Sequence, residues 1–255
     1  AIVASLREPD SMAVPLHFAA ATAREFGARS VGLIAPYLAY MRQDKRFHPG
    51  EAVSAPLFAQ FLEQDFDWVV TVDPHLHRNP SLERIFQKPA LHAVSAPLLA
   101  DWIKSEINDA ILIGPDGESE QWVADIAALA GVPYQILKKE RHGDRDVSVS
   151  LPDPAAAQNR NPVIIDDIVS SGRTIIETLG HLKRMNLHPA TCIVIHAVFS
   201  EGTYEQVLAA GAAGIVSTDT IVHASNAISV AKLLAHSTAE VMGLSWLEKS
   251  ANTGK

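Results

Sequence analysis

The stretch from Val163 to Leu182, VIIDDIVSSGRTIIETLGHL, constrains the fold more than any other part of this chain. Its β-branched run is followed by two carboxylates, Asp166 and Asp167, and then by small residues over 170–172. From Thr174 onward the apolar residues recur with the 3.6-residue period of a helix. This order predicts a buried parallel strand, a tight turn and a helix. Ligands of parallel sheets bind at the carboxyl ends of the strands, so we expect function at this turn.

The chemistry of the turn favours a phosphorylated sugar. A helix that begins after a loop of small residues presents unpaired N–H groups and a positive dipole end, both of which attract phosphate. Two adjacent carboxylates accept hydrogen bonds from neighbouring sugar hydroxyls or bind a divalent metal. The alternative is an acidic turn with a Ser/Gly helix cap. The aspartate pair alone favours that alternative, whereas the combination of strand, aspartates and SSGRT favours the sugar phosphate.

Composition limits the other possibilities. With 255 residues, 47% of them hydrophobic, the chain can bury a full core, and β-branched runs that alternate with helical patterns predict the α/β class. A net charge of −8 without a Lys/Arg-rich run argues against binding along a nucleic acid. No apolar run approaches the roughly 20 residues of a membrane span, and the start lacks a signal-peptide pattern. The single cysteine, Cys192, is expected to pack in the core, which fits the cytoplasm.

The stretch from Val163 to Leu182 resembles the phosphoribosyl-diphosphate loop of type I phosphoribosyltransferases and of ribose-phosphate pyrophosphokinases (PRPP synthetases). The resemblance implies that Asp166 and Asp167 hold the ribose 2- and 3-hydroxyls. It also implies that five consecutive residues surround the 5-phosphate: Ser170, Ser171, Gly172, Arg173 and Thr174. This stretch alone does not distinguish the two families.

A second unusual segment, YMRQDKRFHPG over 40–50, follows a predicted strand at 31–35. Its composition alone favours a solvated basic loop, although its cations and amide could also reach a nucleotide, and Tyr40 or Phe47 could offer it a ring face. RQDKRF resembles the ATP-binding loop of the PRPP synthetases, an element that phosphoribosyltransferases lack. The resemblance implies an ATP site with three residues, Arg42, Gln43 and Asp44.

Two further motifs concern a metal. VDPHLHR resembles the VDxH motif of the PRPP synthetases, which implies that His75 contacts Mg²⁺ or nucleotide phosphates. GPDGES resembles their SPDxGGxxRA motif, which implies that Asp116 supports the Mg²⁺ and ribose site. Glu118 and Ser119 stand in place of the two glycines and Trp122 in place of the arginine, which adds charge and Cβ atoms where the loop approaches its ligand.

A polar run, KKERHGDRD over 138–146, has the composition of a solvated hairpin. Its position resembles the catalytic flexible loop of the PRPP synthetases, whose K-x-R pair corresponds to Lys139 and Arg141. Two cations on a closing loop would stabilise charge on the phosphoryl oxygens in the transition state. The implied reaction transfers the diphosphoryl group of ATP to ribose 5-phosphate and yields PRPP and AMP.

The resemblance covers nearly the whole chain and implies two similar phosphoribosyltransferase-like halves, each a mostly parallel sheet flanked by helices. Residues 1–94 would form the half with the ATP loop, without the first strand and helix of the family, and residues 95–255 the half with the ribose-phosphate loop. The chain starts without Met, so we expect it to begin inside a longer gene product. The pattern at 225–235 predicts a terminal amphipathic helix.

The resemblance also implies a homodimer or a larger homo-oligomer. Two other functions stay open at this point. A salvage phosphoribosyltransferase would share the DDIVSSGRT segment, and a non-catalytic regulatory protein that binds nucleotides would fit the departures around Glu118.

Overall fold

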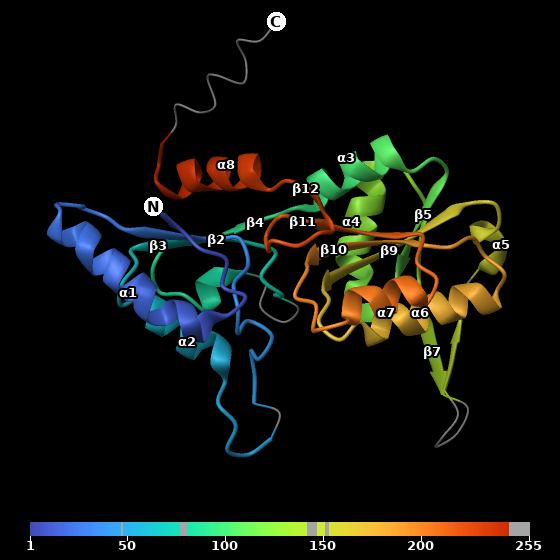
Figure 1. Ribbon diagram of the computed structural model, residues 1–255, viewed down its shortest axis with the longest axis horizontal. Coiled ribbons are helices and arrows are strands. Elements are labelled where there is room, and N and C mark those ends of the chain that lie inside the picture. Colours follow the sequence, from blue (N-terminus) through green and yellow to red (C-terminus); the bar gives the residue numbers. More distant parts are fainter. Residues whose placement is uncertain (47, 77–80, 142–146, 151–152, 245–255) are drawn as a thin grey trace, which may run out of the picture. The chain divides into compact units, whose positions relative to one another are not determined.

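The computed structural model describes residues 1–46, 48–76, 81–141, 147–150 and 153–244. Contacts divide the chain into two compact units. The first contains Ala1–Val94 and Val230–Lys255, and the second contains Ser95–Ser229. Each unit has a parallel sheet flanked by helices (Figure 1), which confirms the predicted α/β class.

The sheet of the first unit has four parallel strands in the order β1-β2-β3-β4. They are β1 (Ile2–Val3), β2 (Gly32–Ala35), β3 (Trp68–Val72) and β4 (Ala90–Ala93). Every residue of β3 is buried, as expected of a parallel strand that is covered on both faces. The helices are α1 (Pro9–Glu25), α2 (Ser54–Leu62), the short 3₁₀ helix η1 (Leu82–Arg84) and α8 (Ala231–Val241), which packs on β3 and β4.

The main sheet of the second unit has six parallel strands in the order β12-β11-β10-β9-β5-β6. They are β5 (Ala110–Gly114), β6 (Tyr134–Ile136), β9 (Asn161–Ile168), β10 (Thr191–His196), β11 (Gly214–Thr218) and β12 (Asn226–Ile228). An antiparallel hairpin joins β7 (Lys138–Arg141) to β8 (Val147–Ser150). The helices are α3 (Ala96–Glu106), η2 (Gly117–Ser119), α4 (Glu120–Ala130), α5 (Pro154–Ala157), α6 (Arg173–Arg184) and α7 (Thr203–Ala209).

The core of the second unit consists of the β-branched runs on its central strands. Ile111 in β5, Ile164 in β9 and Val194 in β10 have no exposed surface, and Leu179 of α6 packs in the same cluster. Cys192 belongs to this cluster, as predicted, and is fully buried. Burial, together with the charge of Asp166, raises the pKa of its thiol to about 12. Its role is therefore in packing.

The predicted terminal helix at 225–235 is present, but it begins later in the chain than predicted. Asn226–Ile228 forms β12, and the helix α8 begins only at Ala231. The amide of Asn226 explains the difference, because its Nδ2 donates to the carbonyl oxygens of Thr218 at 2.7 Å and Ile221 at 3.1 Å. These bonds hold an extended segment beside β11. Because α8 then packs on β3 and β4, the described residues from Val230 onward belong to the first unit rather than to the second predicted half, 95–255.

None of the helices in the described ranges is long and apolar enough to cross a membrane.

Candidate active site

The turn between β9 and α6 has the form expected of a phosphate-binding loop. Gly172 is buried and adopts a φ of +66°, in the left-handed region that favours glycine. A Cβ at this position would lie 2.8 Å from Thr203 Cγ2 and 3.0 Å from Val207 Cγ2, both in α7. The first turn of α6 starts immediately afterwards, where the N–H of Ile176 donates to the Gly172 carbonyl at 2.9 Å. Gly172 is therefore required for two reasons, which are the backbone conformation and the close contact with α7.

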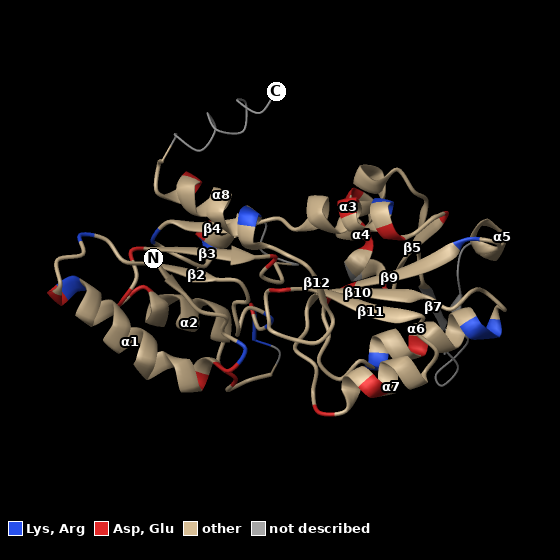
Figure 2. Cartoon of the chain, turned by 45° about the horizontal axis from the view of Figure 1, so that its top comes forward, with Lys and Arg blue, Asp and Glu red and all other residues tan. Residues whose placement is uncertain are grey.

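Helix α6 directs its positive end at this loop. Its last turn carries His181, Lys183 and Arg184, and the basic pair is visible at that end in Figure 2. Lys183 and Arg184 match the negative end of the helix dipole, whereas the first turn keeps N–H groups that no intrahelical bond uses. Around that first turn Ser171, Arg173 and Thr174 are exposed and Ser170 is partly buried. The loop can therefore receive an anion.

Two aspartates end β9 beside this loop, and a third follows the neighbouring strand β5. Partial burial raises the pKa of Asp166 to about 8, and the charges of Asp167 and Asp116 raise it further in that order of importance. A hydrogen bond between the carboxyls of Asp166 and Asp167 contributes as well. Asp167 also accepts the N–H of Ile168 at 2.8 Å. Three carboxylates thus share one edge of the sheet, and near neutral pH Asp166 holds a proton.

The loop after β5 folds back on itself around Asp116. The N–H of Ser119 donates to Asp116 Oδ1 at 3.1 Å, and the Ser119 hydroxyl donates to the Asp116 carbonyl at 2.6 Å. Ser119 is only 3% exposed, so this replacement of a family glycine points into the loop. Among the described residues, the indole Nε1 of Trp122 is buried without a hydrogen-bond partner. At this position the arginine of the motif is replaced by a side chain without charge.

The hairpin carries the predicted K-x-R pair. The register places Lys139 opposite Val149 and Arg141 opposite Val147. Two positions that are two residues apart in a strand share one face of the ladder. The tip of the predicted loop, 142–146, lies outside the described residues.

In the first unit, His75 lies in a strained turn directly after β3. Asp73 and His75 adopt positive φ values of 32° and 49°, which are uncommon for residues other than glycine. The His75 N–H donates to the Asp73 carbonyl at 2.9 Å, and the ring of His92 in β4 contacts Asp73 Oδ1 at 2.8 Å. This conformation keeps His75 at the carboxyl end of a parallel strand, where ligands bind.

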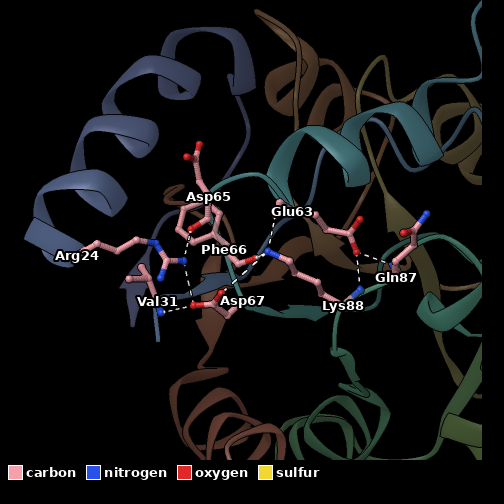
Figure 3. Close-up of polar contacts among 8 residues, drawn as sticks. All are labelled: Arg24, Val31, Glu63, Asp65, Phe66, Asp67, Gln87 and Lys88. Atoms are coloured by element: carbon pink, nitrogen blue, oxygen red, sulfur yellow. Dashed lines mark hydrogen bonds and ion pairs between the residues drawn. The ribbon is translucent and has the colours of Figure 1, made fainter. Parts of the chain in front are cut away.

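A polar network fixes the other end of β3 (Figure 3). Asp67 Oδ2 accepts the Val31 N–H at 2.8 Å and Arg24 Nη2 at 2.9 Å, and Lys88 Nζ donates to the Phe66 carbonyl at 2.9 Å. The Val31 bond is the main reason why the pKa of Asp67 is lowered, with a smaller contribution from Arg24. These contacts join α1 and the segment before β4 to β3. We therefore infer that the network stabilises the fold of the first unit.

The predicted ATP loop is anchored at Tyr40. The Tyr40 hydroxyl donates to Asp10 Oδ1 at 2.6 Å, which raises the pKa of the phenol, and its ring packs edge-on against Phe58. The hydroxyl of Ser54 donates to the Tyr40 carbonyl at 2.9 Å. Tyr40 therefore holds the loop in place and is 41% exposed, whereas Phe47 lies outside the described residues.

The predicted ATP residues follow this anchor. Arg42 is exposed, Gln43 and Asp44 are partly buried, and the Gln43 carbonyl accepts the Ala55 N–H at 3.1 Å. The loop after β2 thus presents a cation at the carboxyl end of its sheet, which is the edge where ligands bind.

The predicted site residues therefore fall in both units. Asp116, Asp166 and Asp167 share one edge in the second unit, whereas His75 and the residues 42–44 belong to the first unit. Within the described ranges, no group of three His, Cys, Asp or Glu side chains has a geometry that could hold a metal ion.

Sequence reasoning gave no role to two polar residues beside these motifs. His92 contacts Asp73. Ser200 contacts Ser170 in the loop between β9 and α6, residues 169–172, which we call the phosphate loop. Both lie near the carboxyl end of a strand that pairs with a motif-bearing strand. Strand order was the signal that could have found them.

These features define a chain with a phosphoribosyltransferase-type fold and, between β9 and α6, a loop of the form expected for phosphate binding. The phosphoribosyl transferase domain family matches residues 81–229, and the N-terminal domain of ribose phosphate pyrophosphokinase matches residues 1–65. The crystal structure of phosphoribosylpyrophosphate synthetase from Mycobacterium smegmatis has a similar fold, with a TM-score of 0.79 and 22% identity over 94% of this chain and 80% of that chain.

Comparison with individual proteins identifies the family more closely. The ribose-phosphate pyrophosphokinase of Methanopyrus kandleri is 31% identical over 87% of this chain and 75% of its own length. Ribose-phosphate pyrophosphokinase 2 of Archaeoglobus fulgidus is 33% identical over 79% of this chain and 72% of its own length. The chain belongs to the ribose-phosphate pyrophosphokinase family.

Proposed function

We propose that this chain is a Mg²⁺-dependent ribose-phosphate diphosphokinase that uses ATP and ribose 5-phosphate. The anomeric hydroxyl of the sugar attacks the β-phosphorus of ATP, a new O–P bond forms, and the bond from that phosphorus to the bridging oxygen of AMP breaks. The products are PRPP, AMP and the proton of the hydroxyl. The observation that carries this proposal is the phosphate loop between β9 and α6, with its paired aspartates, in a chain of this family.

We assign the acceptor sugar to the second unit. Asp166 and Asp167 would bind the ribose hydroxyls, and the loop from Ser170 to Thr174 would surround the 5-phosphate. A carboxyl with a pKa of about 8 both donates and accepts hydrogen bonds near neutral pH, which suits a pair of hydroxyls. The positive end of α6 and the small residues of the loop suit the phosphate.

We assign the nucleotide to two loops. Arg42, Gln43 and Asp44 would bind ATP, because they present a cation, an amide and a carboxylate after β2. Lys139 and Arg141 would stabilise the diphosphoryl group as it is transferred, because two cations on a hairpin can neutralise charge that spreads over phosphoryl oxygens. Phosphoryl transfer needs positioning and neutralisation more than a covalent nucleophile.

The carboxylates of the second unit fit a divalent cation. Burial is the main reason why the pKa of Asp166 is raised and the charges of Asp167 and Asp116 add to it, and a positive ion beside them would relieve this repulsion. Mg²⁺ usually keeps several waters and binds one or two carboxylates plus substrate phosphates, so a cluster of three protein ligands is not needed. We propose that Asp116 is a protein contact of this ion, and separately that His75 in the first unit contacts Mg²⁺ or the nucleotide phosphates. When bound, Mg²⁺ would neutralise charge on the ATP phosphates.

We also propose that the chain works as a homodimer or a larger homo-oligomer, and that it works in the cytoplasm. The family resemblance supports the oligomer, and the single buried cysteine supports the cytoplasmic location. Analytical ultracentrifugation measures the oligomeric state, and a protein that sediments as a monomer would exclude the proposed homo-oligomer.

Phosphorus NMR of the protein with Mg²⁺, ATP and ribose 5-phosphate tests the activity directly. We expect resonances of AMP and of the 1-diphosphate to appear together in equal amounts. A salvage phosphoribosyltransferase would not make AMP from these substrates. ADP and inorganic phosphate as the only products would overturn the proposal.

A non-catalytic, nucleotide-binding role is the second candidate, because Trp122, in the first turn of α4, stands where the motif of the family has an arginine. Ser119 weakens this candidate, since its side chain is buried and bonded within the loop rather than placed toward a ligand. The regulatory candidate predicts that ATP binds with no AMP formed at saturating Mg²⁺. Isothermal calorimetry beside the NMR measurement separates the two candidates.

A further inference from the structure

The segment after β10 bonds to the phosphate loop at several points. The Val169 N–H donates to the His196 carbonyl at 3.3 Å, and the Ser200 N–H donates to the Ser170 carbonyl at 3.0 Å. The hydroxyls of Ser170 and Ser200 lie 3.2 Å apart, within hydrogen-bond distance. The first half of the phosphate loop is therefore attached to its neighbouring strand through both backbone and side chain.

The same segment supports the second half of the loop. The N–H of Thr203, the first residue of α7, donates to the Ser200 carbonyl at 3.0 Å. Thr203 and Val207 then form the surface against which Gly172 packs. Residues 200–207 thus contact the phosphate loop at both of its ends.

An aromatic cluster fixes Ser200 in place. Phe199 is 5% exposed, and its ring centroid lies 4.8 Å from that of His223 and 5.9 Å from that of Tyr204. His223 and Tyr204 are 5.1 Å apart, so the three rings contact one another. Ser200 itself is exposed. Its hydroxyl is therefore held in position by its neighbour while contributing little to the core.

We propose that Ser200 is a positioning residue for the sugar phosphate, which acts through the hydroxyl of Ser170. A serine side chain has three staggered rotamers, and a hydrogen bond from a fixed neighbour selects one of them before the ligand arrives. Such preorganisation strengthens binding because the ligand no longer has to order the side chain. The inference rests on the proposed function, since the ligand is ribose 5-phosphate.

Steady-state kinetics of Ser200→Ala test this role. We expect the KM for ribose 5-phosphate to rise about fivefold, or about 1 kcal/mol at 1.4 kcal/mol per tenfold change. We expect kcat and the KM for ATP to stay within about twofold, whereas partial misfolding would lower kcat instead. Ser200→Thr keeps the hydroxyl and should restore the KM. Ser105→Ala is the matched control, because it removes an exposed serine that also makes one hydrogen bond, to the Trp102 carbonyl in α3.

Calorimetric binding of ribose 5-phosphate to single and double variants identifies the route. If Ser200 acts through Ser170, the double variant Ser170→Ala/Ser200→Ala should bind as weakly as Ser170→Ala alone. Fully additive losses would mean that Ser200 contacts the ligand independently, and they would overturn the proposal. Normal binding by Ser200→Ala would also overturn it while leaving the proposed function intact. A wild-type protein that binds no ribose 5-phosphate would overturn both.

Discussion

Asp166→Asn should stabilise the protein and abolish its sugar site at the same time. In the folded protein the pKa of Asp166 is raised from 3.8 to about 8, first by burial and then by Asp167 and Asp116. An unfolded chain has an ordinary aspartate pKa of about 3.9. Between these two values the folded state holds a proton that the unfolded state has lost. The stability of the wild type must therefore fall as the pH rises from about 4 to about 8, and the full penalty is present above pH 8.

The size of the effect follows from the same interval. A pKa that is raised by about four corresponds to at most about 5 kcal/mol, at 1.36 kcal/mol for each tenfold change in proton affinity. Asp166 is only partly buried and its charge is shared with Asp167, so we expect about 2 kcal/mol. At this chain length that is a rise in Tm of about 4 to 8 °C at pH 9. At pH 4 the wild type and the variant should melt together.

Thermal melts from pH 4 to pH 9, without Mg²⁺, measure this difference. Asp125→Asn is the matched control, because it makes the same chemical change at an exposed position of α4. Its melting temperature should follow that of the wild type at every pH. Parallel profiles of the wild type and Asp166→Asn across the whole range would refute the reasoning. Calorimetry should show that Asp166→Asn no longer binds ribose 5-phosphate.

Four other substitutions, one of them with a matched control, test separate parts of the site. Lys139→Ala should lower kcat by about a hundredfold or more, with the affinity for ribose 5-phosphate nearly unchanged. Asp167→Ala should weaken that affinity at least about tenfold. Equal effects of the two substitutions on binding alone would contradict this division of roles between Lys139 and Asp167. Gly172→Ala should lower the free energy of unfolding by about 2 kcal/mol or more. Gly131 has a similar φ but open space around it, so Gly131→Ala should lower the free energy of unfolding by only about 1 kcal/mol. Equal losses of stability in urea titrations would exclude the contact with α7. Tyr40→Phe should raise the KM for ATP about fivefold through the lost bond to Asp10, and an unchanged KM would leave the loop without this anchor.

The parts of the fold that depend on local sequence could be predicted. The strand, turn and helix from Val163 to Leu182 appear in the structure because a β-branched run, small residues and a 3.6-residue period act over short distances. The burial of Cys192 follows in the same way from its apolar neighbours. The proximity of Asp116 to Asp166 could be expected only in outline, because it depends on β5 and β9 being neighbours in the sheet.

The parts that depend on distant contacts could not be predicted. The segment 225–235 has an amphipathic pattern, but the amide of Asn226 bonds to two carbonyls near β11, so Asn226–Ile228 forms an edge strand and the helix begins only at Ala231. Where α8 packs is set by β3 and β4, which are more than 130 residues away in the sequence. The bond between Ser200 and Ser170 likewise joins the ends of two strands, and no local pattern contains it.

The candidate site is the place where this chain departs from the rules that stabilise a fold. Three aspartates repel one another at one sheet edge, Gly172 is held in a left-handed conformation, and Asp73 and His75 adopt strained backbone angles. Each feature lies within or after a strand that has a buried run, which comprises every residue of β3 and β5 and residues 162–165 of β9. A rigid strand can hold such a feature because its packing is too costly to rearrange. If this arrangement serves the ligands, then Mg²⁺ with ribose 5-phosphate should raise the melting temperature of the wild type more than that of Asp166→Asn, since the variant has lost the charge of Asp166 and is expected not to bind the sugar.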